Sequence, residues 1–182
     1  MELNEYQNAS HRTCPDLGSL KLNVAHMIMG MVSELEELFE AIDKGDIVNI
    51  GEELTDQYWY LSNYCRYFNI SFEDLDFENV IQLEPIKGIE DLLMRITKSI
   101  SKLTDVEKKS LAYNKEVNAE RRLDFCKDIF RMIKLTYTYF SLNMYKCMEN
   151  NIQKLRIRFP DKFTEKHAIN RDLENERKAL EA

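Results

Sequence analysis

Apolar residues recur every three to four positions along most of the chain, a spacing that predicts amphipathic helices. A first long helix is expected over residues 21–43, because Gly45 follows as a typical stop signal. Its apolar stripe consists of Val24, Met27, Met31, Leu35, Leu38 and Ile42. A second long helix is expected over residues 47–68. Its main stripe consists of Ile47, Ile50, Leu54, Tyr58, Leu61 and Cys65.

Two further helices are predicted at residues 86–103 and 119–148, separated by a charged, loop-like segment at residues 104–118. A short helix is expected near the N-terminus, and the charged tail at residues 164–182 is expected to form a solvated helix with internal ion pairs. The order helix, loop, helix therefore occurs twice. Only 5 Gly and 3 Pro are present, which also favours helices over a turn-rich β architecture. We predict an all-α fold with a four-helix core built from this repeat, plus a C-terminal helical tail.

Two pairs of carboxylates, each one helical turn apart, supply the candidate chemistry. Glu34 and Glu37 form the first pair, and Glu53 and Asp56 form the second in the following helix. Residues three apart lie on the same face of a helix, so antiparallel packing of the two helices would bring four carboxylates to one place. Four hard oxygen ligands held by rigid helices suit Mg²⁺ or Mn²⁺.

The helical positions separate the first pair from the acidic residues around it. Glu34 lies at the edge of the apolar stripe, and Glu37 lies one step further round. Glu36 and Glu40 fall toward the opposite side, where solvent is expected. We therefore select Glu34 and Glu37 over the alternative frame that uses Glu36 and Glu40.

The second pair lies on a face of its helix that is expected to be packed. Glu53 and Asp56 are off the main apolar stripe, and their face continues into three tyrosines. These tyrosines are Tyr60, Tyr64 and Tyr67. A carboxylate on a packed face needs a partner or a metal ion.

The repeat also suggests how the chain is divided. The 182 residues fit one domain. Within it, residues 1–70 are expected to form the half with the intact metal site, and residues 85–148 a degenerate copy without the carboxylates. Residues 149–182 are expected to form a C-terminal basic block and tail.

Composition and charge exclude several function classes. A formal net charge of -7 gives the chain no overall field that attracts DNA, RNA or anionic lipid. No run of residues reaches the roughly 18 apolar positions that a membrane span needs, and no signal peptide is evident. The 4 cysteines form no C-x-x-C motif, which indicates buried reduced thiols. We expect a cytoplasmic protein that binds neither a nucleic-acid polymer nor a membrane.

The carboxylate motifs resemble those of the all-α nucleoside triphosphate pyrophosphohydrolases, namely MazG, MazG-like phage proteins and the dimeric dUTPase and dCTPase relatives. The family pattern is E-E-x-x-E, followed in the next helix by E-x-x-D. Ser33–Leu38 reads S-E-L-E-E-L and fits the first part, with Ser33 in place of the first glutamate as in phage-type members. Glu52–Leu61 reads E-E-L-T-D-Q-Y-W-Y-L and resembles the family's E-E-L-G-D-x-x-W-Y-L, with Thr55 in place of glycine.

Both ends of the chain extend the resemblance. Gln7 and its neighbours are similar to the opening of MazG-like phage proteins, and Asn151–Phe163 is similar to their C-terminal block. Lys154 and Arg158 stand one turn apart in that block and are candidates for holding phosphate oxygens. Gln7 and Asn151 are candidates for reading the base.

The resemblance implies hydrolysis of a (d)NTP to the monophosphate and pyrophosphate. Glu34, Glu37, Glu53 and Asp56 would hold Mg²⁺, with Mn²⁺ as an alternative, and the metal would activate a water and orient the phosphates. Glu37 and Glu53 are the candidate catalytic residues, with Glu37 as the candidate general base. Relatives dimerise, which favours a homodimer, and a monomer also stays open.

Other functions stay open at this point. One is a nucleotide-binding or regulatory helical module that has lost catalysis, and another is a purely structural helical protein. A third is a hydrolase of (p)ppGpp or of a modified nucleotide, because base recognition depends on the shape of a pocket rather than on a motif. His26 and Trp59 are interpreted as structural residues.

Overall fold

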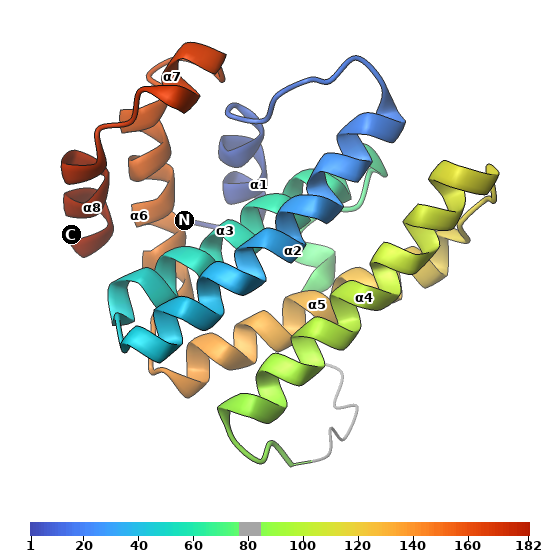
Figure 1. Ribbon diagram of the computed structural model, residues 1–182, viewed down its shortest axis with the longest axis horizontal. Helices are drawn as coiled ribbons and strands as arrows, with labels where there is room; N and C mark the ends of the chain where they lie inside the picture. The colour runs from blue at the N-terminus through green and yellow to red at the C-terminus, as the bar shows by residue number, and fades with distance from the viewer. Residues whose placement is uncertain (77–84) are drawn as a thin grey trace.

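The computed structural model describes residues 1–76 and 85–182, and within these ranges the chain is helical without a strand (Figure 1). In chain order the helices are α1 (Leu3–His11), α2 (Leu20–Lys44), α3 (Ile47–Tyr67), the 3-10 helix η1 (Glu73–Leu75), α4 (Ile89–Tyr113), α5 (Ala119–Tyr139), α6 (Met144–Arg158), α7 (Glu165–Ile169) and α8 (Leu173–Glu181). The predicted all-α fold is confirmed. Among the described helices, none has both the length and the apolar character that a membrane crossing requires.

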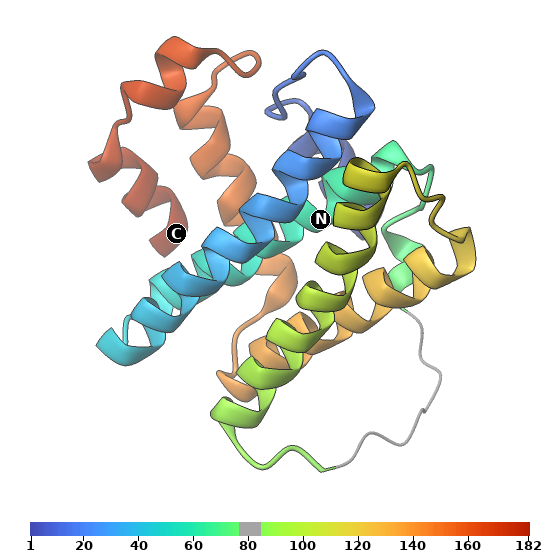
Figure 2. The same ribbon diagram turned by 45° about the vertical axis from the view of Figure 1, so that its right-hand side comes forward.

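Four helices form the core as two antiparallel pairs. Helix α2 packs along α3, and α4 packs along α5, while α2 also contacts α4 and α3 contacts α5. Helices α1 and α6 lie against α3, and α8 lies along α6 (Figures 1 and 2). This arrangement confirms the predicted four-helix core and C-terminal helical tail, and it places α3 in contact with helices from every part of the chain.

A sharp turn holds α2 and α3 together. Gly45 adopts a left-handed conformation (φ 65°) and donates its backbone N–H to the carbonyls of Ala41 and Ile42, which ends α2. Asp46 begins α3, because its side chain accepts a hydrogen bond from the backbone N–H of Asn49. The two helices are therefore antiparallel neighbours, as the convergence of their carboxylates requires.

The predicted apolar stripes of α2 and α3 lie mostly in the core. Ile47 is an exception, because it is 46% exposed beside the turn. Tyr58 shows how α3 connects to α5: its ring stacks on Phe130 with 4.8 Å between ring centroids. Its hydroxyl donates a 3.0 Å hydrogen bond to the backbone carbonyl of Phe130. A polar atom at the end of an aromatic core residue is thereby satisfied.

The loop predicted at residues 104–118 is wrong over most of its length, because α4 continues to Tyr113. Glu107 shows the reason. Its carboxylate is buried and accepts hydrogen bonds from Tyr64 Oη and Arg122 Nε. A charged residue in this segment therefore pairs inside the protein, where a charged pattern suggested a solvated loop.

The single helix predicted at residues 119–148 is also wrong, because the structure divides it into α5 and α6. Ser141 adopts a left-handed conformation (φ 55°) after the end of α5. The Asn143 side chain then accepts a hydrogen bond from the backbone N–H of Lys146 and begins α6. The break redirects the chain, so that α6 packs on α3.

Gly30 on α2 allows the ring of Tyr60 on α3 to lie directly against the helix. A Cβ atom at position 30 would lie 2.0 Å from Cε1 of Tyr60, which is far inside van der Waals contact. The ring also packs edge-on against His26 and Trp59, with centroid distances of 5.8 Å and 4.8 Å. Tyr60 therefore has little room to move away.

We expect Gly30→Ala to destabilise the protein by about 1–3 kcal/mol, because the added methyl group forces the Tyr60 ring out of place. Urea unfolding measures the change. Gly51→Ala is the matched control: a Cβ there would meet Cys147 Sγ at 3.2 Å, a contact at the end of a flexible side chain. Equal stability of the two variants would contradict the close approach of Tyr60 to α2.

Candidate functional site

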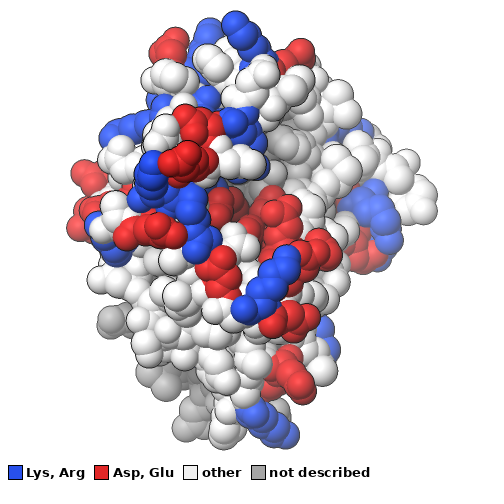
Figure 3. All heavy atoms as spheres, turned by 60° about the vertical axis from the view of Figure 1, so that its left-hand side comes forward, with Lys and Arg blue, Asp and Glu red and all other residues white. Residues whose placement is uncertain are grey.

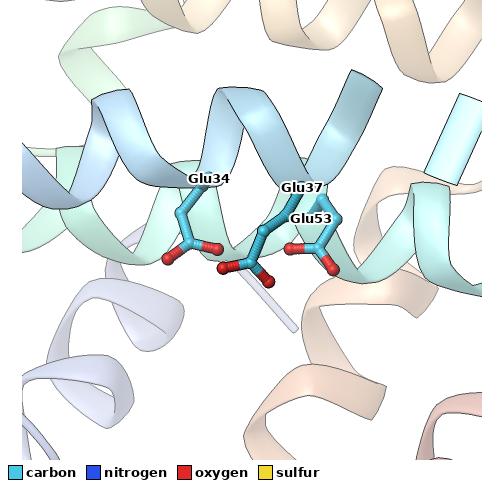
Figure 4. Close-up of side chains that lie close together, drawn as sticks. All are labelled: Glu34, Glu37 and Glu53. Carbon is cyan, nitrogen blue, oxygen red and sulfur yellow. The ribbon is translucent and has the colours of Figure 1, made fainter. Parts of the chain in front are cut away.

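Three carboxylates from α2 and α3 converge on one side of the helix pair. Glu34 and Glu37 come from α2 and Glu53 from α3, and Figure 4 shows their side chains pointing the same way. One oxygen from each carboxylate lies within 4.8 Å of the others. Glu53 is buried, Glu34 is half-buried, and Glu37 is exposed. No other group of three His, Cys, Asp or Glu side chains in the described parts of the chain comes this close together.

Asp56, the fourth predicted ligand, lies one turn further along α3 and faces α6. One of its carboxylate oxygens accepts a 2.6 Å hydrogen bond from Asn151 Nδ2, and the other lies 2.6 Å from Lys154 Nζ. Lys154 is 1% exposed and also contacts Glu52 Oε1 at 3.0 Å. Asn151 and Lys154, predicted to bind substrate, thus hold acidic side chains of α3.

Burial and mutual repulsion oppose ionisation of the clustered carboxylates. Burial, together with the negative charge of Asp56, raises the pKa of Glu34 to about 8 and that of Glu53 to about 10. The pKa of Glu37 is also raised, mainly because neighbouring residues exclude part of the solvent around its carboxylate, and then by the charge of Asp56. Burial disfavours the charged form of Lys154, but the carboxylates beside it outweigh this effect and raise its pKa. One buried ammonium cannot offset this many carboxylates, so full ionisation needs further positive charge.

Two arginines approach the acidic group from the C-terminal part of the chain, one at the end of α6 and one between α7 and α8. Arg158 at the end of α6 donates two hydrogen bonds, of 3.1 Å and 2.5 Å, to the carboxylate of Glu176 on α8. Arg171 donates to the same carboxylate at 3.2 Å and 2.7 Å, and its charge partly offsets the rise in the Glu37 pKa. Figure 3 shows basic and acidic side chains interleaved on the face of the molecule that carries the C-terminal helices.

The C-terminal tail is more closely packed than predicted. Glu176 is only 2% exposed, and Arg177 reaches back to both carboxylate oxygens of Asp46 at 3.0 Å. Ion pairs internal to the tail are present, as expected. The Arg158–Glu176 and Arg177–Asp46 ion pairs, in addition, tie the tail to α6 and to the start of α3. The expectation of a solvated helix is therefore wrong at Glu176, because a carboxylate held by two arginines can be buried.

Gln7 lies away from this group, and its amide is already engaged. Its Nε2 donates to the backbone carbonyls of Ser62 and Ile70, both at 3.1 Å. Its Oε1 accepts from the backbone N–H of Phe72 at 3.3 Å. The structure therefore places Gln7 as a connector between α1 and the end of α3, with both of its amide hydrogens engaged.

A cavity of about 520 Å³ opens beside the carboxylates. Its polar rim includes Glu34, Asp56 and Arg158, and its apolar wall is largely aromatic. The wall is formed by Trp59, Tyr60, Leu155, Phe159, Phe163 and Ala168. Such a volume suits a small organic ligand with one flat apolar end and one charged end.

His26 and Trp59, interpreted from the sequence as structural residues, both line this cavity. Trp59 does have a structural role, since its Nε1 donates to Ser10 O and to Thr13 Oγ1. His26 has a buried Nδ1 without a hydrogen-bond partner among the described residues.

Three residues of the site were not assigned from the sequence, namely Glu52, Arg171 and Glu176. Glu52 belongs to the E-E-L-T-D segment but is one position away from the pair at one-turn spacing. Arg171 and Glu176 lie in the charged tail, and only the chain fold brings them to α6. The signal that could have found them is a lysine or arginine at a buried position of α6, because a buried basic side chain needs a carboxylate partner.

One comparison with known proteins found a match, in the segment that carries the clustered carboxylates. Residues 23–87, about a third of the chain, match the family model described as MazG nucleotide pyrophosphohydrolase domain. The match includes α2 and α3 and confirms that the chain is MazG-like in the segment that carries the clustered carboxylates. Searches of curated proteins and of solved structures gave no significant match.

Without divalent cations, we expect the stability of the protein to fall as the pH rises from about 5 to about 9. The pKa values of Glu34 and Glu53 lie near 8 and 10 in the folded protein, above their ordinary value of 4.5. The folded state therefore keeps protons that the unfolded chain releases above pH 4.5, and each further rise in pH favours unfolding.

Thermal unfolding in EDTA at several pH values measures this dependence. Glu53→Gln should flatten it, because a glutamine carries no charge at any of these pH values. Glu40→Gln, on the exposed side of α2, serves as the control and should keep the wild-type slope. A wild-type melting temperature that stays constant over this range would contradict the burial of mutually repelling carboxylates.

Proposed function

We propose that this protein is a divalent-cation-dependent nucleoside triphosphate pyrophosphohydrolase. The observation that carries the proposal is the convergence of Glu34, Glu37 and Glu53 beside a cavity with an aromatic wall. The match of this segment to the MazG domain supports it, because that domain is defined by nucleotide pyrophosphohydrolysis. A triphosphate is anionic, and an acidic site can accept it only with cations.

The residues present fit Mg²⁺, and Mn²⁺ would suit them equally. Glu34, Glu37 and Glu53 offer hard carboxylate oxygens from two rigid helices, and Asp56 lies one turn away. Their raised pKa values indicate a site that lacks positive charge. When bound, the metal would lower the pKa of a coordinated water and offset the charge of the phosphates.

The residues around the metal ligands would then have distinct roles. Lys154 and Asn151 would position Asp56 rather than touch the substrate, because their polar groups already bind its carboxylate. Arg158, at the cavity rim, would bind phosphate oxygens. Arg171 would add a second positive charge there, because both arginines bind the carboxylate of Glu176. The aromatic wall would hold the base.

The reaction would be attack of water on the α-phosphorus. The bond from that phosphorus to the oxygen bridging to the β-phosphate breaks, and pyrophosphate leaves as the monophosphate forms. Glu37 is the most exposed of the three carboxylates, so it is the one placed to take the proton of the attacking water. Glu53, which is buried, would keep its role as a ligand throughout.

The test is pyrophosphate release from a panel of NTPs and dNTPs, (p)ppGpp and modified nucleotides, with Mg²⁺. We expect at least one member to be hydrolysed, and we expect Glu53→Gln and Asp56→Asn each to lower kcat at least about 100-fold. Circular dichroism confirms folding, and Glu40→Gln is the control. Wild-type turnover in both variants would exclude the proposed site. Nucleotide binding without turnover on any substrate would favour a regulatory module instead.

Arg158→Ala should raise KM about tenfold or more and change kcat less, because a charge-assisted contact to phosphate contributes mainly to binding. Arg156→Ala is the matched control, since Arg156 lies two positions away on α6 and is exposed. Steady-state kinetics on the best substrate separates the two parameters. Equal effects of the two substitutions would remove Arg158 from the phosphate site.

A further inference from the structure

A second cavity, of about 330 Å³, lies between the start of α2 and the last turns of α4. Figures 1 and 2 show these two helix ends side by side, and Lys21 Nζ joins them by donating a 3.1 Å hydrogen bond to Asn114 Oδ1. We call it the α2–α4 cavity. It has no described lining residue in common with the cavity beside the carboxylates. Its volume falls within the range of small-molecule pockets, roughly 300–1,000 Å³.

The walls of the α2–α4 cavity are mostly apolar. Its large apolar lining residues are Leu20, Val24, Ile28, Met29, Phe68 and Leu111. Three of them are strongly exposed, by 52% at Leu20, 64% at Met29 and 48% at Leu111. Because they are exposed, these three border the opening of the cavity to solvent. Exposed apolar side chains grouped around a hollow are typical of a binding site for an apolar ligand group.

A buried arginine with unused hydrogen-bond donors lines the same cavity. Arg122 is 9% exposed, and its Nε donates to Tyr64 Oη at 2.9 Å and to Glu107 Oε1 at 3.1 Å. Its guanidinium carbon lies 3.6 Å from the centroid of the Phe68 ring, which holds the group from one face. Its terminal nitrogens, Nη1 and Nη2, donate to no residue in the described parts of the chain. A fixed guanidinium with two free donors matches the two oxygens of a carboxylate.

The charged side chains around the cavity also favour an anion. Three basic residues line it, namely Lys21, Lys108 and Arg122, and the one acidic residue among its described lining is Glu107. The whole chain, in contrast, has a net charge of -7. Lys108 contacts Asp105 at 2.9 Å, but this pair is exposed and therefore weak, so Lys108 can exchange it for a ligand. The side-chain partner of Lys21 is a neutral amide, so its charge is not offset.

We propose that the α2–α4 cavity binds an amphipathic carboxylate, of which a medium-chain fatty acid is the simplest example. The carboxylate accepts hydrogen bonds from Nη1 and Nη2 of Arg122, and Lys21 and Lys108 add positive charge beside it. The apolar chain covers the exposed side chains at the opening, such as Met29. The site uses none of the residues proposed for catalysis, so the proposal holds whether or not the protein hydrolyses nucleotides.

Isothermal titration of decanoate into the full chain tests the ligand class. We expect saturable binding of one decanoate per chain, and no binding of acetate, which has the same head group without the apolar chain. Decan-1-ol, which has the chain without the charge, should bind at least about tenfold more weakly, because it makes no charge-assisted hydrogen bonds. Absence of saturable decanoate binding overturns the proposal, and so does equal affinity for decanoate and decan-1-ol.

Variants at the charged groups test where the head group binds. Lys21→Glu should weaken decanoate binding at least about tenfold, because it places a like charge beside the carboxylate. Lys102→Glu is the matched control, since Lys102 is exposed on α4 and does not line the cavity. Arg122→Lys keeps the charge and removes the two-pronged donor, so it should also weaken binding, and circular dichroism checks its fold. Equal affinities of the Lys21→Glu and Lys102→Glu variants would place the ligand elsewhere.

Two further titrations separate this site from other occupants. Glu53→Gln should bind decanoate as the wild type does, because Glu53 does not line the cavity. Loss of decanoate binding in this variant would assign the ligand to the acidic site and contradict the proposal. The affinity for decanoate should also be independent of protein concentration. An affinity that falls as the protein is concentrated would show that a second copy of the chain covers the cavity, and would overturn the small-molecule site.

Discussion

The central constraint on the structure is the electrostatic cost of placing several carboxylates close together in one partly buried site between α2 and α3. Burial disfavours each negative charge, and each charge disfavours its neighbours. Lys154 relieves part of this cost by binding Asp56 and Glu52, and Asn151 supplies a further hydrogen bond to Asp56. Within the described residues, Glu34, Glu37 and Glu53 bind no lysine or arginine directly, and burial together with the neighbouring carboxylates raises their pKa values. The acidic group thus has an excess of negative charge when it is ionised, and a bound divalent cation is the simplest way to neutralise it.

Much of the fold serves to assemble this group. The turn at Gly45 and Asp46 makes α2 and α3 antiparallel neighbours, and Gly30 lets Tyr60 bring them close. The break near Ser141 turns α6 back onto α3, which delivers Lys154 to Asp56. Helix α8 then holds Arg158 near the cavity through Glu176. Charge balance therefore acts together with the buried apolar side chains of α6, Met148 and Ile152 among them, to pack the C-terminal segment on the acidic helices.

The sequence predicted the parts of the site that depend on local periodicity. One-turn spacing and the helical wheel selected Glu34 and Glu37 over Glu36 and Glu40, and the structure clusters the selected pair with Glu53. Local periodicity could not predict ion-pair partners that lie far apart in the sequence and meet only through tertiary contacts. Lys154 was taken for a phosphate ligand because nothing local reveals that Asp56 and Glu52 surround it. Likewise, a charged stretch suggested a loop at Glu107, although Arg122 and Tyr64 from other helices allow it to be buried.

Proton release on metal binding tests the central claim most directly. Isothermal titration of Mg²⁺ or Mn²⁺ into the metal-free protein at pH 7, in buffers of different ionisation enthalpy, counts these protons. Glu34 and Glu53 have pKa values above 7 in the metal-free protein, so at least about one proton should leave per cation bound. Glu53→Gln should weaken binding and reduce the release. Cation binding without proton release, or no binding at all, would contradict the account.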